Sequence, residues 1–236
     1  MVCATEHFKE VVVVTWPSTF VGFDLETTGI SPSSDRIVSA AVVAMSQDSI
    51  LAAHSWLVNP GIAIPAEATA VHGITNERVA AEGQAAADAV QEIVTQLRAA
   101  WDNGLPVVAY NAAFDIPFIW HEADRHGVET GAMGVVLDPL VIWRQLERYR
   151  PGKKRLADAV SRFGLSVEDA HEAMADAKAA VEVMFNLVEL GSLGDVALDE
   201  MMVSQASWHR EWAVDFKAWL EERGKDASDI SLTWPM

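Results

Sequence analysis

Hydrophobic and polar positions in the first quarter of the chain predict three β-strands. Residues 19–26 alternate and are rich in apolar side chains, and residues 36–45 and 50–58 form two further apolar segments. A period of two is typical of strands that have one buried face. Short polar turns separate the three segments, so this part of the chain is predicted to form an antiparallel meander.

The pattern then changes to helical spacing and back again. A turn at HGITN precedes a predicted helix from about Gln84 to Trp101, in which Ala, Ile, Val and Leu recur at helical spacing. Apolar segments at 105–111 and 134–138 predict two buried strands. Further helices are predicted at residues 113–126, 139–149, 154–163 and 171–190. Strands followed by strand and helix alternation indicate an α/β domain with a mixed sheet and helices on both faces.

Residues 192–236 differ in composition from the rest of the chain, because they hold four of the nine Trp and begin with a Gly-containing break, GSLGD. The helix predicted there, which ends at Gly224, carries four aromatic residues on one face: Trp208, Trp212, Phe216 and Trp219. This face either packs back onto the core or is available for partner docking or base stacking. We predict two parts, a core domain at 1–191 and a helical extension at 192–236.

Composition is consistent with a folded chain that has a substantial core. Half of the 236 residues are apolar. The longest apolar runs, such as Val11–Val14 and Val135–Leu137, are much shorter than the roughly 18 residues of a membrane span. Charged residues between Glu6 and Glu10 do not fit a signal peptide. We expect a cytoplasmic protein without membrane association, and the single cysteine, Cys3, predicts neither an internal disulfide nor a metal cluster.

The charge of the chain is strongly negative but unevenly distributed. A formal net charge of −17 argues against nonspecific coating of nucleic acid, because duplex-binding proteins usually present a broad basic surface. Six of the 17 Lys and Arg nevertheless fall within twelve residues: Arg144, Arg148, Arg150, Lys153, Lys154 and Arg155. This cluster is a candidate anion-binding patch, and a solvated helix end with its loop is the alternative.

Two acids occupy the end of the first predicted strand, in the stretch VGFDLETTGI (21–30). Side chains at positions i and i+2 of a strand share a face, so Asp24 and Glu26 point the same way, and Gly22 leaves room beside them. Two adjacent carboxylates disfavour joint ionisation unless a cation binds between them. A hard divalent metal is therefore one interpretation, and a pair of solvated turn residues is the other.

Two later stretches add candidate groups. Asp115 lies in NAAFDIPF, where a strand leads into a helix, and its alternative role is an ordinary N-cap. His171 and Asp176 lie in HEAMADA, five residues apart, so they would not share a face if both were inside a helix. We expect His171 at or before the first turn, where it can move, and Asp176 fixed on the helix. A surface histidine beside a surface acid is the alternative.

Taken together, four acids and one histidine at the ends of strands and the starts of helices match the requirements of two-metal phosphodiester cleavage. Two metal ions about 3.5–4 Å apart would hold the phosphate and activate a water molecule. A histidine can accept the proton of that water near neutral pH. Carboxylate ligands without cysteine favour Mg²⁺ or Mn²⁺ over Zn²⁺.

The stretches FDLETTG, NAAFDIPF and HEAMADA, in this order and with these separations, resemble the three motifs of the DEDDh 3′–5′ exonucleases. The proofreading epsilon subunit of bacterial DNA polymerase III typifies that family. A further stretch, VHGITN (71–76), resembles another element of the group. The resemblance covers about residues 19–190 and implies a ribonuclease-H-like fold, for which we expect a mixed five-stranded sheet flanked by helices.

The resemblance also implies roles for individual residues. Asp24, Glu26 and Asp176 would hold the metals, with Asp24 bridging them. Asp115 would support the second metal, directly or through water, and His171 would be the general base. The positions that contact the 3′-terminal nucleotide in the family correspond here to Thr28, Gly29, His72 and Phe114. From the residues alone, His72 could equally be a turn or cap residue and Phe114 a core residue.

Three further features accompany the motifs. Tyr110 precedes Asn111 where many members of the family have His, a difference that leaves the five chemical positions unchanged. Asp138 before Pro139 is predicted to be a helix N-cap. The basic cluster at 144–155 could hold backbone phosphates upstream of the scissile bond.

The resulting functional hypothesis is a metal-dependent enzyme that removes nucleoside 5′-monophosphates from a single-stranded or frayed 3′ end, with DNA favoured by the resemblance to the proofreading group. One alternative is an RNA exonuclease of the ribonuclease T or oligoribonuclease type. Another is a non-catalytic module that binds a polymerase through the Trp-rich C-terminal segment. A polymerase subunit is a candidate partner under either the proofreading or the binding hypothesis.

Overall fold

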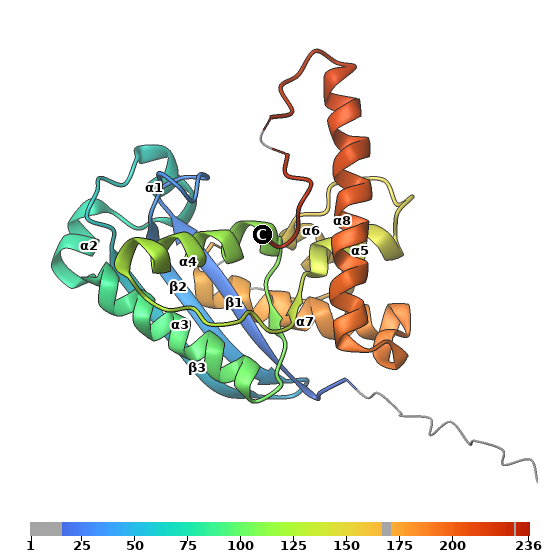
Figure 1. The fold of residues 1–236 in the computed structure, drawn as a ribbon, viewed down its shortest axis with the longest axis horizontal. Helices are drawn as coiled ribbons and strands as arrows, with labels where there is room; N and C mark the ends of the chain where they lie inside the picture. Colours follow the sequence, from blue (N-terminus) through green and yellow to red (C-terminus); the bar gives the residue numbers. More distant parts are fainter. Residues whose placement is uncertain (1–15, 167–170, 229) are drawn as a thin grey trace, which may run out of the picture.

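The computed structural model describes residues 16–166, 171–228 and 230–236 (Figure 1). Within these residues a six-stranded sheet has the order β4-β3-β2-β1-β5-β6. The strands are β1 (Thr19–Thr27), β2 (Ile37–Ser46), β3 (Ile50–Asn59), β4 (Gln84–Ala85), β5 (Val107–Val108) and β6 (Val136–Leu137). Neighbours among β1, β2 and β3 are antiparallel, and the remaining pairs are parallel. The predicted α/β class with a mixed sheet is confirmed. Cys3 and Val11–Val14 lie outside the described residues.

Helices surround this sheet and form the C-terminal part of the molecule. They are α1 (Ala66–His72), α2 (Asn76–Glu82), α3 (Ala86–Asp102), α4 (Ala112–His126), α5 (Pro139–Leu146), α6 (Leu156–Phe163), α7 (Ala173–Gly191) and α8 (Leu198–Glu221). A short 3₁₀ turn at Leu193–Asp195 joins α7 to α8. None of the helices in the described part of the chain is long and apolar enough to cross a membrane.

The sheet has one strand more than the five predicted. β4 forms at Gln84–Ala85, where the sequence predicted the start of a helix, because the end of β3 at Val58 and Asn59 offers parallel backbone partners. The predicted turn at HGITN lies between two short helices that were not predicted, α1 and α2, and Gly73, with a positive φ of 72°, ends α1. Strands β5 and β6 are only two residues long, so the apolar runs that predicted them are mostly buried connections.

Successive side chains of β1 supply two different packing layers. Val21, Phe23 and Leu25 are buried in one core cluster with residues of α3 and α4. Phe20 is buried in a second cluster with residues of α7 and α5. Asp24 and Glu26 alternate with the first group and therefore face the α7 side. Figure 1 shows the two layers on opposite sides of the strands, with α3 and α4 in front and α7 behind.

Helix α8 covers the edge of the sheet next to β6 and packs on α5. The Gln205 side chain is fully buried, donates to the Val136 carbonyl at 3.0 Å and accepts from the Asp138 backbone N–H at 2.6 Å. A side chain thus takes the place of a further strand at this edge. The chain then turns back, and Trp234 enters the core beside Trp208. The aromatic face predicted to pack on the core does so at Trp208.

Candidate active site

The acids of β1 lie in the middle of the sheet, on the strand that joins its antiparallel and parallel halves. Asp24 is opposite Ala41 of β2 and Glu26 is opposite Ser39. The pairing shifts register directly after Glu26. Both side chains are half-buried, so the alternative of two solvated turn residues does not hold. The acids belong to the strand itself and share its α7 side.

Helix α7 brings the third acid to this face, because β1 and α7 approach closely at Gly22. A Cβ atom added at Gly22 would clash with the Ala177 carbonyl oxygen and lie 2.9 Å from Cγ2 of Val181. Only a glycine therefore fits between this strand and this helix. Asp176, in the first turn of α7 and next to Ala177, is held over the strand at the level of the two acids.

One carboxylate oxygen each from Asp24, Glu26 and Asp176 lies within 4.8 Å of the other two. Burial raises the pKa of Asp24 well above its ordinary value, and the charges of Asp115, Asp176 and Glu26 add to this effect. Burial and the charge of Asp176 raise the pKa of Glu26 to about 7. Burial also raises the pKa of Asp176, against the opposing effect of His171. Three acids held in this way favour a bound cation over free ionisation.

Asp115 approaches the same strand from the other side of the sheet. It lies inside the first turn of α4, where Asn111 and not Asp115 occupies the N-cap position. Its Oδ1 accepts a hydrogen bond from the Leu25 backbone N–H at 3.1 Å, and only 3% of the residue is exposed. Burial raises the pKa of Asp115, while the bond from Leu25 opposes this shift. Asp115 is thus fixed against the strand between Asp24 and Glu26.

The two histidines of the motifs border one hollow of about 440 Å³ together with Glu26 and Trp56. His171 is exposed and lies just before α7, which agrees with its predicted position ahead of the first turn. Its backbone φ is 70°. His72 ends α1, and its Nδ1 accepts from the Ile74 backbone N–H at 3.1 Å. Its Nε2 is buried and has no hydrogen-bond partner among the described residues. Burial lowers the pKa of His72.

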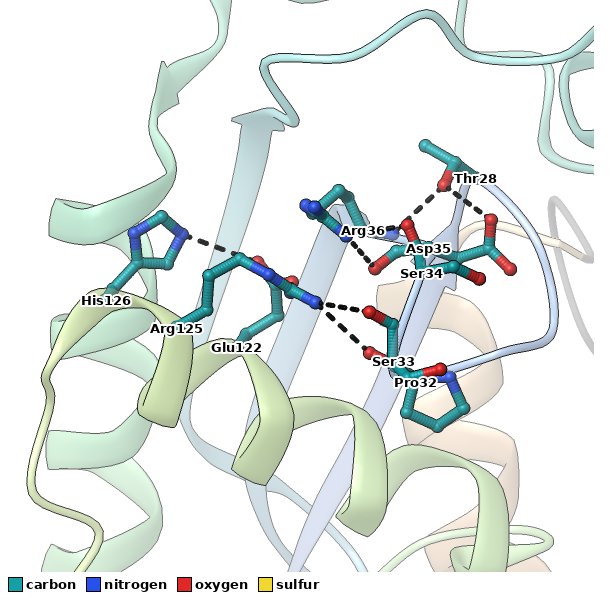
Figure 2. A network of polar contacts seen from close by, with 9 residues as sticks. All are labelled: Thr28, Pro32, Ser33, Ser34, Asp35, Arg36, Glu122, Arg125 and His126. Carbon is teal, nitrogen blue, oxygen red and sulfur yellow. Dashed lines mark hydrogen bonds and ion pairs between the residues drawn. The ribbon is translucent and has the colours of Figure 1, made fainter.

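Thr28 and Gly29 begin the loop between β1 and β2, whose shape depends on Asp35 (Figure 2). The Thr28 hydroxyl accepts from the Arg36 backbone N–H at 3.0 Å and lies 3.4 Å from Oδ1 of Asp35. A Cβ atom at Gly29 would collide with the Asp35 carboxylate. The glycine is therefore needed for packing within the loop, in addition to any approach of a ligand.

Helix α4 anchors the far side of this loop. Arg125 donates to the carbonyl oxygens of Pro32 and Ser33 and forms an ion pair with Glu122, which is fully buried. Figure 2 shows Arg125 pointing from α4 to the loop, with His126 beside Glu122. Phe114, on the same helix, is half-buried against Phe118, with 4.8 Å between the ring centroids. The fold places Phe114 at the edge of the core cluster that includes Ile116 and Phe118.

The family model of the RNase T exonucleases matches residues 21–184, a span that includes the three acids of the cluster, Asp115 and both histidines. The chain belongs to the RNase T exonuclease family. The predicted resemblance to DEDD exonucleases is thereby confirmed.

Curated relatives of this chain include PolC-type DNA polymerases. It is 32% identical over 166 residues to a PolC-type DNA polymerase III of Clostridium perfringens, which corresponds to 70% of this chain and 11% of the relative. It is 30% identical over 172 residues to the same kind of protein from Listeria innocua, covering 73% and 11% of the two chains. The chain thus spans about a tenth of the length of these relatives.

Solved structures of exonucleases share the fold. Exonuclease I of E. coli in complex with a dT13 oligonucleotide matches 82% of this chain and 44% of its own, with a TM-score of 0.61 and 22% identity. Exonuclease X in complex with 5′-overhanging duplex DNA matches 78% of this chain and 99% of its own, with a TM-score of 0.57 and 21% identity. The mixed sheet with flanking helices is therefore that of the ribonuclease-H-like exonucleases.

One residue near the candidate site does more than its sequence context predicted. Asp138 is the N-cap of α5, as predicted, and accepts from the Leu140 backbone N–H at 2.9 Å. It also accepts from the backbone N–H groups of Asn111 and Ala112, at 3.0 and 2.9 Å, and from Trp234 at 3.1 Å. Asp138 thereby fixes the start of α4, and with it Asp115. No local pattern signals contacts over such sequence distances.

Proposed function

We propose that the chain is a metal-dependent 3′–5′ exonuclease that hydrolyses DNA to nucleoside 5′-monophosphates. The observation that carries the proposal is the cluster of Asp24, Glu26 and Asp176, whose oxygens lie within 4.8 Å of one another. Membership in the exonuclease family supports the reaction class. Residues 1–191 form the exonuclease domain in this proposal, and 192–236 a helical extension.

The donor set fits divalent cations of the Mg²⁺ or Mn²⁺ type. It consists of carboxylate oxygens alone, which hard cations prefer. Burial, with the charges of neighbouring acids, raises the pKa values of Asp24 and Glu26, which favours a cation between the carboxylates. Asp24, Glu26 and Asp176 would hold two ions with the support of Asp115. Bound ions of this kind stabilise charge on phosphate oxygens and lower the pKa of water.

Proton transfer from the attacking water is assigned to a side chain of the protein. His171 is exposed at the hollow beside Glu26, where an imidazole nitrogen can accept a proton from the attacking water and release it to solvent. The position of His171 before the first turn of α7 keeps its side chain free of the helix. The fold of α7 meanwhile fixes Asp176, so the base and the metal ligand are separately positioned.

The hollow of about 440 Å³ is the proposed site of the 3′-terminal nucleotide. The unpartnered Nε2 of His72 provides a buried polar group that a sugar or phosphate oxygen can satisfy. Thr28 and Gly29 belong to the loop that follows β1, and Phe114 presents a ring from α4; none of these three residues is among those that line the hollow. These four residues remain the proposed nucleotide contacts.

DNA is the proposed substrate because the curated relatives are DNA polymerases and the solved exonucleases carry DNA. An RNA exonuclease of the ribonuclease T or oligoribonuclease type is the alternative, since none of the proposed contacts is specific for the 2′-hydroxyl group that distinguishes RNA. The similarity to PolC-type polymerases also favours a polymerase subunit as a partner.

An end-label assay tests the proposal. The protein with Mg²⁺ or Mn²⁺ is given 5′-labelled single-stranded DNA, a mismatched primer–template and RNA, beside the Asp24→Ala variant. We expect the wild type to shorten DNA progressively from the 3′ end and to be faster on DNA than on RNA. The proposal fails if the wild type and Asp24→Ala degrade every substrate equally, or if neither degrades any. Faster hydrolysis of RNA would favour the alternative substrate.

A further inference from the structure

A second hollow, of about 470 Å³, lies between α5, the connection from α5 to α6, and α8. We call it the basic groove. Its cationic side chains are those of the cluster found in the sequence: Arg144, Arg148, Arg150, Lys153, Lys154 and Arg155. In Figure 1, α5, α6 and α8 lie at one end of the molecule, and α1 and α2, which border the nucleotide hollow, lie at the other.

Charge in the basic groove is opposite to that of the whole chain. Six cationic side chains line it but only two acidic ones, Glu211 and Asp215, in a protein of net charge −17. Both acids pair with Arg148, at 3.8 and 3.3 Å. Within the part of the chain that the structure describes, neither Lys153 nor Lys154 forms an ion pair. The groove therefore retains positive charge for an anionic ligand.

The opposite wall of the groove carries Trp212 and Phe216, and Trp219 continues this ladder of aromatic rings along α8, beyond the residues that line the groove. Trp212 and Phe216 stack with centroids 5.1 Å apart and planes at 17°, and Phe216 and Trp219 follow at 5.8 Å and 13°. The guanidinium of Arg144 lies 3.5 Å from the centroid of Trp212. Trp208 packs against both core clusters, whereas these three rings belong to neither. The Trp219 residue is 43% exposed. The guanidinium of Arg223 lies over Trp219 at 4.1 Å from its centroid, so a base that stacks on the ladder takes the place of a guanidinium, which is then available for a phosphate.

The position of the groove relates it to the acid cluster. Strand β1, with the acids, is central in the sheet. The nucleotide hollow is lined by β2 and β3 residues on one side of β1, whereas α5 and α8 adjoin β6 on the other. Tyr110, directly before the start of α4, links the two regions because its hydroxyl donates to the Lys154 carbonyl oxygen at 2.8 Å. A strand whose 3′ end occupied the hollow would cross the acids and continue toward the groove.

We propose that the basic groove binds a single-stranded stretch of nucleic acid upstream of the 3′ end, with phosphates on Lys153 and Lys154 and bases on the ladder of Trp212, Phe216 and Trp219. This rests on the proposed function for the direction of the strand. An acidic protein segment would use the cations as well, but it has no planar groups to stack on the ladder, so nucleic acid fits both walls.

Binding without hydrolysis tests the groove by itself. Fluorescence anisotropy in EDTA follows a labelled oligothymidylate of about 16 nucleotides, long enough for a typical single-strand site. We expect the double variant Lys153→Ala with Lys154→Ala to weaken oligothymidylate binding about tenfold. The slope of the logarithm of the binding constant against the logarithm of the salt concentration should become shallower by about 1.4, because two phosphate contacts are lost. Phe216→Ala should weaken binding about tenfold with the slope unchanged. Arg210→Ala, an exposed cation of α8 outside the groove, is the matched control.

Three further arms separate the possible outcomes. Lys153→Arg with Lys154→Arg should retain binding, which excludes misfolding as the cause of a loss. Cleavage of the p-nitrophenyl ester of thymidine 5′-monophosphate, too short to reach the groove, should be unaffected by the groove variants. If the groove variants bind oligothymidylate like the wild type, the groove proposal is overturned, whereas failure to cleave the ester counts against the proposed function alone. Equal competition by polyglutamate, with no effect of Phe216→Ala, would assign the groove to an acidic protein and also overturn the proposal.

Discussion

Asp24 and Glu26 carry their charges on one face of a strand because the side-chain period of a strand is two. The same rule places Val21, Phe23 and Leu25 in the opposite layer, as the core cluster shows. This part of the site could be predicted from sequence. The bond from the Leu25 backbone to Asp115 could not, because it joins residues 90 positions apart and depends on how α4 packs.

At the residue scale, His171 is predicted to act as the base. Replacing it with Ala should lower kcat on single-stranded DNA by about 100-fold or more, the usual contribution of general base catalysis, with KM changed much less. Steady-state kinetics of the two proteins measures both parameters.

The matched control for this prediction is His121→Ala, since His121 is exposed on α4 and does not line the hollow. It should leave kcat unchanged. An unchanged kcat in the His171 variant would assign the proton transfer to another group.

At the scale of elements, the site depends on how closely β1 and α7 pack at Gly22. The sequence predicted room beside the acids, and the structure shows that a helix carrying Asp176 uses this room. The order of long strands and helices was likewise predictable from periodicity. The apolar segments also predicted β5 and β6, but not that each is only two residues long, and β4 was not predicted at all, because so short a ladder is decided by neighbouring backbone and not by its own side chains.

Gly22→Ala should separate β1 from α7. The added methyl group would clash with the Ala177 carbonyl oxygen, so we expect a loss of about 1–3 kcal/mol in the free energy of unfolding. The displaced Asp176 should also weaken metal binding, so that Mn²⁺ raises the melting temperature less than it does in the wild type. Thermal unfolding with and without Mn²⁺ gives both quantities.

Gly194→Ala serves as the control, because a Cβ atom there meets nothing within 4 Å. It should respond to Mn²⁺ like the wild type. An equal Mn²⁺ response in the Gly22 variant would show that the close approach of α7 does not position the metal ligands.

At the scale of the whole molecule, the C-terminal segment is integrated with the sheet. The composition of residues 192–236 predicted a helical extension, and within it Gln205 completes the edge at β6 and Trp234 donates to Asp138. Compositional breaks mark changes in sequence character, whereas packing between distant segments leaves no local pattern. The prediction of a helix with an aromatic face was correct. Tertiary contacts decide that Trp208 packs on the core and that the other three rings form an outer ladder.

Gln205→Leu tests this integration. The leucine fills a similar volume but leaves the Val136 carbonyl and the Asp138 N–H buried without their partner, so stability should fall by about 1–3 kcal/mol. Urea unfolding measures the change, and Gln91→Leu, at an exposed position of α3, is the control. Equal midpoints for the two variants would mean that α8 does not seal the edge of the sheet.

The central claim, that a carboxylate cluster binds metal for hydrolysis at a 3′ end, is tested most directly by the single-turnover rate of Asp176→Asn. This rate is measured on 5′-labelled single-stranded DNA with Mg²⁺, beside Asp48→Asn at an exposed turn. Loss of a metal ligand removes several kcal/mol of charge stabilisation, so the rate should fall by about 100-fold or more while Asp48→Asn matches the wild type. Equal rates for Asp176→Asn and the wild type would contradict the account.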